Sequence, residues 1–186
     1  MKTWISAALA AGVVLSAASP ALALGRFGVR VGTGTSFFVS DEDYPTEPEV
    51  TPFAIGAAYV LDLAIIGVEI DALWWRNTTT LGDFTAVDDH LAIPIIGKFS
   101  LPLIPAFLSL NFGLGLEPRF LLAGPKEADN YNDYVMYLPV VAGADFDLQL
   151  IQAGVEVRYE HQLTETYDGQ GDDRLHQLMF FGGVFF

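Results

Sequence analysis

The chain has 186 residues, contains no cysteine and carries a formal charge of −14, although 52% of its residues are hydrophobic. High apolar content and high net charge rarely coexist in a soluble domain, but they are natural if apolar side chains face lipid and charged ones lie in loops. The absence of cysteine excludes disulfide bonds and a lipid-modified cysteine anchor. The acidic balance, without a basic patch, argues against nucleic acid as a partner.

The first 23 residues have the features of a cleaved secretory signal peptide. Lys2 supplies a short positive start, residues 4–18 are apolar, and Pro20 ends the apolar run. The small-x-small pattern Ala21-Leu22-Ala23 follows as a cleavage site. We therefore predict an exported chain with a signal peptide over 1–23 and a single domain over 24–186.

Apolar residues alternate with polar or small ones in eight stretches of the mature chain. A soluble strand has about 5–6 residues, whereas a tilted membrane-spanning strand needs about 9–11. The clearest stretch, Phe107–Leu122, is long enough for the second kind. In chain order the predicted strands are Gly25–Phe38, Pro52–Leu61, Gly67–Arg76, His90–Ser100, Phe107–Leu122, Tyr134–Phe146, Ile151–Leu163 and a last strand that ends at Phe186.

Long polar segments alternate with tight turns between these strands. The tight turns fall near residues 62–66, 101–105 and 147–150. An even strand number with this asymmetry is typical of outer-membrane barrels, so we predict an all-β, eight-stranded antiparallel up-and-down transmembrane β-barrel. Both chain ends should then lie on the tight-turn side. The four predicted loops are Ser40–Thr51, Asn77–Asp89, Ala123–Asp133 and Thr164–Asp173.

One uncharged run, Phe99–Leu116, is long enough for a transmembrane helix. Pro102 and Pro105 near its start argue against this alternative, and a strand also places its polar residues inside a barrel. Pro94 and Pro139 occupy matching places in a weak repeat with an offset of 45 residues. Because proline removes a ladder hydrogen bond, we predict β-bulges at both positions.

The charge separates between loops and strands. Fifteen of the 23 acidic residues lie in the four predicted loops, accompanied only by the base Lys126. Charged residues of the strands share the polar parity, and a Lys or Arg facing lipid at the bilayer centre costs roughly 2–4 kcal/mol. We therefore predict an ion-paired lumen, with a proton or ion path as the alternative, formed by Arg26, Arg30, Glu69, Asp71, Lys98, Glu117, Arg119, Asp145, Glu156, Arg158 and Glu160.

The chain ends in alternating residues and a terminal aromatic. Phe180, Val184 and Phe186 resemble the C-terminal signal that the barrel-assembly machinery reads as an added strand, although Gly182 interrupts the bulky pattern. Aromatic residues near strand ends suit two interfacial girdles. They are Phe38, Tyr59, Trp74, Trp75, Phe99, Tyr134, Phe146, Tyr159 and Phe186.

The chain resembles the small outer-membrane β-barrel families, OmpA/OmpX-like and especially PorT-like. The resemblance rests on HLAIPIIGKFSLP (90–102), LNFGLGLEPRF (110–120) and the ending GGVFF (182–186), and it covers essentially the whole mature chain. It implies a barrel in the outer membrane. Because members generally lack an established biochemical function, the resemblance implies no activity.

Catalytic residues are hard to assemble from this sequence. Barrel enzymes that act on outer-membrane lipid use Ser and His near strand ends, yet no serine follows Ser109. His90, His161 and His176 are expected at external strand ends as girdle or rim residues, although a His–Asp pair with a water remains open for the last two. We predict no enzyme, no catalytic residue, no cofactor and no metal-ligand set of fixed spacing. A lipid-modifying enzyme is the second alternative.

We therefore expect an outer-membrane barrel of structural or surface-interaction type, with a small-solute or ion channel as the first alternative. Its expected partners are outer-membrane lipid and, during insertion, the barrel-assembly machinery. The acidic loops offer oxygens to Ca²⁺ or Mg²⁺, which are candidate partners that would bridge the loops to lipid headgroups. We expect a monomer.

Overall fold

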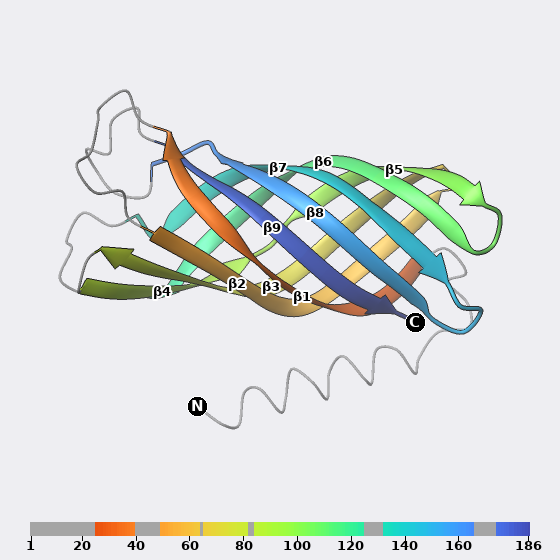
Figure 1. Cartoon of the computed structure of the whole chain (residues 1–186), viewed down its shortest axis with the longest axis horizontal. Helices are drawn as coiled ribbons and strands as arrows, with labels where there is room; N and C mark the ends of the chain where they lie inside the picture. Colours follow the sequence, from red (N-terminus) through yellow and green to blue (C-terminus); the bar gives the residue numbers. More distant parts are fainter. Residues whose placement is uncertain (1–24, 40–48, 64, 82–83, 125–131, 166–173) are drawn as a thin grey trace.

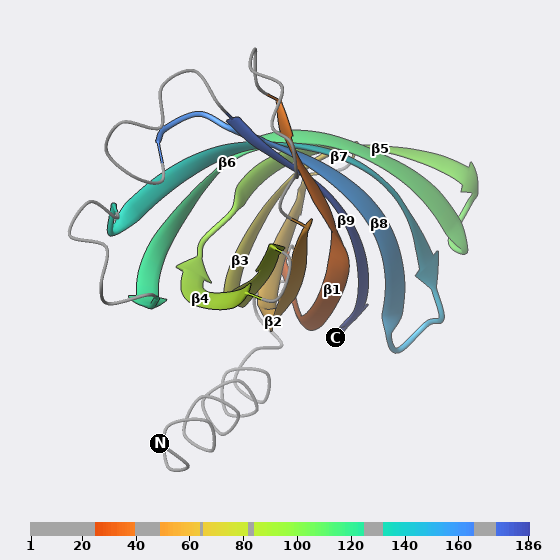
Figure 2. The same ribbon diagram turned by 60° about the vertical axis from the view of Figure 1, so that its left-hand side comes forward.

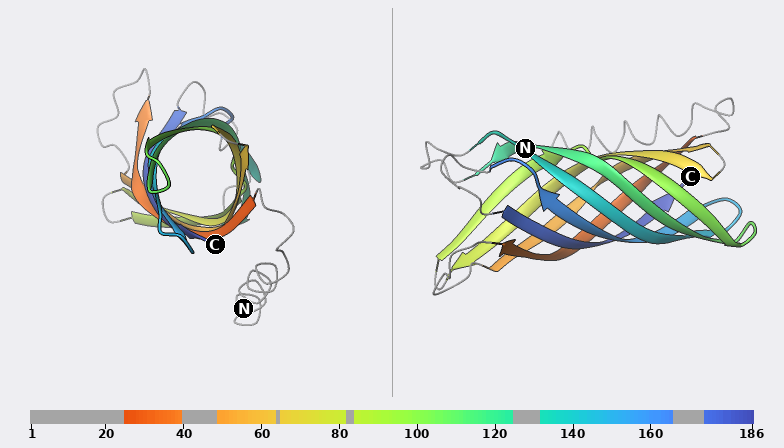
Figure 3. Two further views of the ribbon diagram at one scale, coloured as in Figure 1. Left: turned by 90° about the vertical axis from the view of Figure 1, so that its right-hand side faces the viewer. Right: turned by 90° about the horizontal axis from the view of Figure 1, so that it is seen from above.

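The computed structural model describes residues 25–39, 49–63, 65–81, 84–124, 132–165 and 174–186. They form one closed antiparallel sheet, seen end on in Figure 3. Neighbouring strands follow the order β2-β1-β9-β8-β7-β6-β4-β3-β5, and the β2–β3 and β5–β6 pairs complete the ring. The strands are β1 (Gly25–Val39), β2 (Glu49–Leu63), β3 (Ile66–Leu81), β4 (Phe84–Ala92), β5 (Ile95–Ile104), β6 (Leu108–Ala123), β7 (Tyr134–Asp147), β8 (Gln152–Gln162) and β9 (Arg174–Phe185).

β4 and β5 are two halves of one barrel strand. Both pair with β3 on one side and with β6 on the other, and the pairing register is the same before and after the break. The barrel therefore has eight antiparallel strands across its wall in up-and-down order, which confirms the predicted fold. Figures 1 and 2 show that the strands of the wall are strongly tilted relative to the long axis of the barrel.

The break between β4 and β5 falls at Pro94, but it is not the predicted bulge, because no residue is inserted there. The amide of Asp71 donates to the Pro94 carbonyl at 3.0 Å, and that of Ile93 donates to the Pro118 carbonyl at 2.9 Å. Proline has no N–H to return the first bond. The interruption therefore follows from a missing donor, while the bonds on either side keep the register.

Pro139 also lacks the predicted bulge. It pairs with Glu160 in β8, and the register of β7 against β6 is unchanged between the Leu114–Val140 and Glu117–Tyr137 pairs. An extended backbone accommodates the φ angle of proline. Pro139 therefore removes one hydrogen-bond donor from the ladder, and the strand continues without a change of register.

The predicted loop Asn77–Asp89 is wrong, because most of it forms a β-hairpin. β3 continues to Leu81 and β4 begins at Phe84, with pairs such as Thr79–Ala86 between them. Ladder bonds need only backbone groups, and the three consecutive threonines favour extended structure. Polarity therefore indicated exposure to water here but did not end the strands. Large parts of the other three predicted loops (40–48, 125–131 and 166–173) lie outside the described residues.

Side chains alternate between the outside and the lumen along every strand. Large apolar residues of the outward parity remain exposed, including Val29, Ile55, Leu114 and Phe180. No helix among the described residues is long and apolar enough to cross a membrane. The alternative of a helix over Phe99–Leu116 is wrong, since this segment contributes to β5, a turn and β6.

The two ends of the barrel differ. At the turn end, short connections join β2 to β3, β5 to β6 and β7 to β8. β1 begins and β9 ends there too, with Gly28 paired to Phe185, so the predicted placement of both chain ends is confirmed for the described residues. The opposite, loop end carries the β3–β4 hairpin. The predicted signal peptide lies outside the described residues.

A small apolar core lies inside the lumen. Leu73, Trp75 and Met179 are inaccessible to solvent and pack with Phe181 and two alanines. The girdle prediction for Trp75 is therefore wrong, because its parity is that of the buried residues, whereas Trp74 faces outward. Phe185 forms a second buried cluster with Ala58 and Val60 at the turn end.

Candidate functional site: the charged lumen

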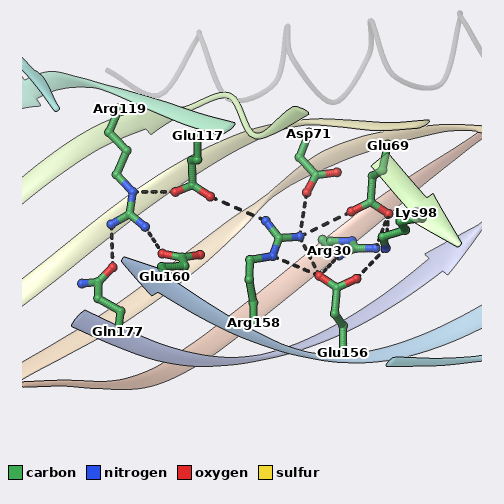
Figure 4. Close-up of polar contacts among 10 residues, drawn as sticks. All are labelled: Arg30, Glu69, Asp71, Lys98, Glu117, Arg119, Glu156, Arg158, Glu160 and Gln177. Carbon is green, nitrogen blue, oxygen red and sulfur yellow. Dashed lines mark hydrogen bonds and ion pairs between the residues drawn. The ribbon is translucent and has the colours of Figure 1, made fainter. Parts of the chain in front are cut away.

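Three cations and three carboxylates form what we call the inner cluster, in the half of the lumen nearer the turn end (Figure 4). Its centre is Glu156 on β8, whose carboxylate accepts hydrogen bonds from three cations. The distances are 2.8 Å from Arg30, 2.5 Å from Lys98 and 2.7 Å from Arg158. Glu69 on β3 accepts from Arg30 and Lys98 at 2.7 Å each. Strands β1, β3, β5 and β8 are thereby joined across the lumen.

Arg158 also reaches the second acidic residue of β3. One of its terminal nitrogens lies 3.2 Å from Asp71 Oδ2 and 3.4 Å from Glu69 Oε1. The guanidinium lies 4.6 Å from the Phe181 ring centroid. Since Arg158 is inaccessible to solvent, these carboxylates replace the water that its charge would otherwise require.

A second group, the outer cluster, surrounds Arg119 on β6. Its Nε donates to Glu117 at 2.5 Å, one terminal nitrogen donates to Gln177 at 2.6 Å, and the other to Glu160. The guanidinium is held between two rings, 3.6 Å from the Trp75 centroid and 3.9 Å from that of Tyr137. Hydrogen bonds in the plane and rings on its faces together enclose this cation.

The two clusters are linked by an ion pair between Arg158 Nη1 and Glu117 Oε2, which lie 3.6 Å apart. Together the clusters contain four cations and five carboxylates, so the charge is nearly balanced. Burying unpaired charges in this way would be strongly unfavourable, whereas a network with shared partners stabilises them. Paired charge therefore occupies the lumen beside the small apolar core.

Nine of the eleven predicted lumen residues lie in these two clusters, and two lie apart from them. Arg26 is only half-buried and pairs with Asp62 near the turn end, a residue that we predicted in a tight connection. Asp145 is half-buried in the same region and makes no ion pair within 4 Å among the described residues. Both therefore line the turn-end opening of the lumen.

Uncharged polar residues extend the network toward the loop end, and our sequence analysis did not single them out. Gln177 donates to Ser36 at 3.0 Å and to Asn77 at 3.2 Å, and the Trp75 indole donates to Asn77 at 3.1 Å. Gln162 accepts a bond from the Leu175 amide at 2.7 Å. All lie on the inward parity of their strands. Parity alone would have identified them if the prediction of lumen residues had not been restricted to charged side chains.

Polar residues of the β3–β4 hairpin close the loop end. Asn77 donates to Asp88 at 2.9 Å, and His90 lies 3.3 Å from the same carboxylate. His90 is buried in the lumen, so the prediction that it is a girdle or rim residue is wrong. The Asn77–Asp88 pair lies beyond the Trp74–Leu91 pair and outside the membrane-spanning part. There burial raises the pKa of the Asp88 carboxyl, and the Asn77 amide partly opposes this shift.

Open space occurs in the described lumen at its turn end. Two adjacent cavities there, bordered by Arg30, Asn111 and Asp145, each have room for about one water molecule. The largest fully buried side chains of the described residues are Trp75, Arg119, Arg158, Phe185, Leu73, Ile96, Met179, Gln162, Gln177, Glu69, Glu117 and Glu160, and Glu69 and Phe185 border one of the cavities. Both cavities are therefore too small for a solute larger than water.

The assembly-signal residues and Arg76 lie on the outside of the barrel. Phe180 is exposed and Val184 is half-buried on the outward face of β9, and Phe186, which follows the end of β9, is also exposed. Arg76 lies at the loop end, where it donates to Asp89 at 2.7 and 3.0 Å and contacts the Trp74 ring. The outward-facing arginine therefore lies at the rim, where charge is tolerated.

No family model and no curated protein sequence matches the chain. Among solved structures, it is similar to Neisserial surface protein A, with a TM-score of 0.57 and 11% identity over 85% of this chain and 96% of that chain. It is also similar to the outer membrane enzyme PagL, with a TM-score of 0.57 and 12% identity over 84% of this chain and 97% of that chain.

The chain has the fold of a small outer-membrane β-barrel. The likeness concerns the fold, and it confirms the architecture that the sequence resemblance implied. Eight-stranded barrels with an apolar outer band are outer-membrane structures. The fold and the exposed apolar residues of the barrel exterior therefore support the predicted location in the outer membrane.

Proposed function

We propose that this barrel is a membrane-anchored scaffold of structural or surface-interaction type, whose lumen is closed by charge and whose acidic external segments meet the surroundings. The observation that carries the proposal is the joined inner and outer clusters, which cross-link strands on opposite sides of the lumen. If these ion pairs hold the barrel wall rigid, the external segments are the variable and accessible part of the molecule.

A small-solute or ion channel is the weaker alternative. Conduction requires a water-filled path or a succession of weak sites, whereas Arg119 and Arg158 occupy the lumen with several short contacts each. Opening it would expose several ion pairs at once. This favours a closed barrel.

A lipid-modifying enzyme is the second alternative, and one similar structure is named as an enzyme. A serine hydrolase needs its hydroxyl within hydrogen-bond reach of a base. Three serines are described: Ser36 accepts from Gln177, Ser100 donates to Asn111, and Ser109 is paired in the ladder with Pro102 and Asp145. None of these partners is a histidine, which supports a role without catalysis.

Conductance in planar bilayers tests the closed lumen. We expect the purified mature chain to show no steady openings under voltage, because the buried, ion-paired side chains of the two clusters occupy the lumen. The conductance of Lys98→Ala is compared with that of the unchanged chain. This variant removes a side chain beside the turn-end cavities, while Arg30 and Arg158 still neutralise Glu156. Steady openings of the unchanged chain would favour the channel.

Single-cysteine labelling tests which end faces outward, since the chain contains no cysteine of its own. Asp133→Cys reports the loop end, and Leu150→Cys, at a residue 91% exposed, reports the turn end. A membrane-impermeant maleimide should label the first variant on intact cells and the second only after the outer membrane is permeabilised. The reverse pattern would overturn the external placement of the acidic segments.

We further propose that the partners are outer-membrane lipid, the barrel-assembly machinery during insertion, and Ca²⁺ or Mg²⁺ at the acidic segments, and that the barrel is a monomer. Protease sensitivity of the external segments with and without EDTA tests the cation proposal, because bound cations would shield them. Equal cleavage rates would refute it. Light scattering in detergent, corrected for bound detergent, measures the oligomeric state.

A further inference from the structure

Two histidines meet on the outer surface of the barrel near its loop end. His161 on β8 is directly paired with His176 on β9. Both lie on the outward parity of their strands, in register with exposed residues such as Val157 and Phe180. β8, β9 and β1 lie side by side in Figure 1, and they bring these residues together from distant parts of the sequence.

Two aromatic rings complete what we call the exterior histidine cluster, which consists of Phe37, Tyr159, His161 and His176. Phe37 on β1 is paired with His176 and stacks on its imidazole, with ring centroids 5.5 Å apart and planes inclined by 11°. The Tyr159 hydroxyl is hydrogen-bonded to His176 Nδ1. His176 is therefore held on two sides, and only 8% of its surface remains exposed.

The two imidazoles turn the same nitrogen toward each other. His161 Nδ1 and His176 Nδ1 are hydrogen-bonded to each other at 3.4 Å, and the ring centroids are 4.7 Å apart. Zinc binds imidazole nitrogen at about 2.0–2.1 Å in tetrahedral geometry, which separates two nitrogen ligands by roughly 3.3–3.4 Å. The observed separation thus equals that of two ligands on one tetrahedral ion.

We propose that His161 and His176 form a two-nitrogen chelate for a borderline transition-metal cation such as Zn²⁺ or Cu²⁺ on the outer surface of the barrel. Neutral imidazole suits these metals, whereas Ca²⁺ and Mg²⁺ prefer oxygen ligands. No group of three His, Cys, Asp or Glu side chains gathers as a metal site in the described part of the chain. The two histidines supply two ligands, and water supplies the remainder.

The surrounding groups prepare the site in opposite ways. The register of β8 against β9 and the stacked Phe37 hold the imidazoles before any metal arrives, which lowers the ordering cost of binding. The Tyr159 hydroxyl competes, because its hydrogen bond uses the nitrogen that the metal needs. Removing this hydroxyl should therefore leave metal affinity unchanged or raise it.

The test uses the mature chain folded in detergent micelles without an affinity tag, titrated calorimetrically with ZnCl₂ near pH 7.5. We expect one Zn²⁺ per chain, with affinity reduced at least about tenfold in both His161→Gln and His176→Gln. Tyr159→Phe, which keeps the ring, should bind within about threefold of the unchanged chain or more tightly. A large excess of Ca²⁺ should not displace the Zn²⁺.

Cu²⁺ electron paramagnetic resonance of the unchanged chain gives an independent readout, and it decides the matter if a histidine variant fails to fold. Splitting from two nitrogen ligands supports the chelate, and splitting from one or none overturns it. The proposal also fails if Zn²⁺ does not bind, if both histidine variants bind as the unchanged chain does, or if Tyr159→Phe binds as weakly as they do. Unchanged binding in both histidine variants would locate the ion in the acidic segments instead.

Discussion

The guanidinium of Arg119 lies 3.6 Å from the centroid of the Trp75 ring, inside the lumen of a membrane barrel. The two residues come from strands that are not neighbours at this level, since Trp75 on β3 pairs with His90 on β4. Tyr137 covers the other face of the cation, and Glu117 and Glu160 neutralise it. Arg119 therefore contacts Trp75 on β3 and Glu160 on β8, two strands that lie on opposite sides of the barrel.

Removing the charge of Arg119 should lower the free energy of unfolding. Arg119→Met leaves Glu117 and Glu160 buried without their nearest cation, and breaking a buried pair in this way costs about 3–5 kcal/mol. Urea unfolding of the barrel in micelles measures the loss. The double variant Arg119→Met with Glu160→Gln removes one uncompensated carboxylate and should recover part of it. A loss below about 1 kcal/mol for the single variant would contradict this account.

Glu156 and Asp145 offer a matched comparison of two inward acidic residues. Glu156→Gln removes the carboxylate shared by Arg30, Lys98 and Arg158, so we expect a loss of about 3–5 kcal/mol in unfolding free energy. Asp145→Asn changes a half-buried group without an ion pair, and should cost about 1 kcal/mol or less. Equal losses in both variants would show that the ion pairs of the inner cluster add nothing to the unfolding free energy.

Adjacent tryptophans should differ in their contact with lipid. Trp74 faces outward beside Phe53, whereas Trp75 is inaccessible in the lumen. In vesicles that contain brominated lipids, the fluorescence of Trp75→Phe, which reports Trp74, should be strongly quenched. The fluorescence of Trp74→Phe, which reports Trp75, should persist. Similar quenching in both variants would show that the lumen assignment of Trp75 is incorrect.

Two glycines test the packing of the inner and outer faces of the wall. A Cβ on Gly115 would lie 2.2 Å from the Ile95 carbonyl oxygen, so Gly115→Ala should destabilise the barrel by about 1–3 kcal/mol. A Cβ on Gly182 meets nothing within 4 Å, so Gly182→Ala should change stability by about 0.5 kcal/mol or less. Thermal or urea unfolding in the same micelles compares them, and a larger loss at Gly182 would invert the assignment of faces.

Parity along the strands was enough to predict which side chains enter the lumen. Glu69, Arg119 and Arg158 are buried in the lumen, because a period of two residues leaves only two faces and lipid excludes charge from one of them. The same rule should have placed Trp75 inside. The girdle prediction failed there because it used residue type in place of parity.

Other predictions failed because composition does not report backbone pairing. The hairpin over Asn77–Asp89 is polar yet paired, since strands beyond the membrane need no apolar face. Pro94 and Pro139 each remove a donor, but the neighbouring bonds preserve the register, so neither inserts a residue. Only the complete ladder shows how such a defect is accommodated.

The sequence by itself determined that this chain forms an eight-stranded membrane barrel with charge inside, because alternation, strand length and the cost of charge in lipid all follow from local residue order. Only the tertiary structure decided which side chains meet: Arg158 with Asp71, or His161 with His176. Those pairings depend on strand register and on curvature around the closed wall. Both are set by many weak contacts between residues far apart in the chain.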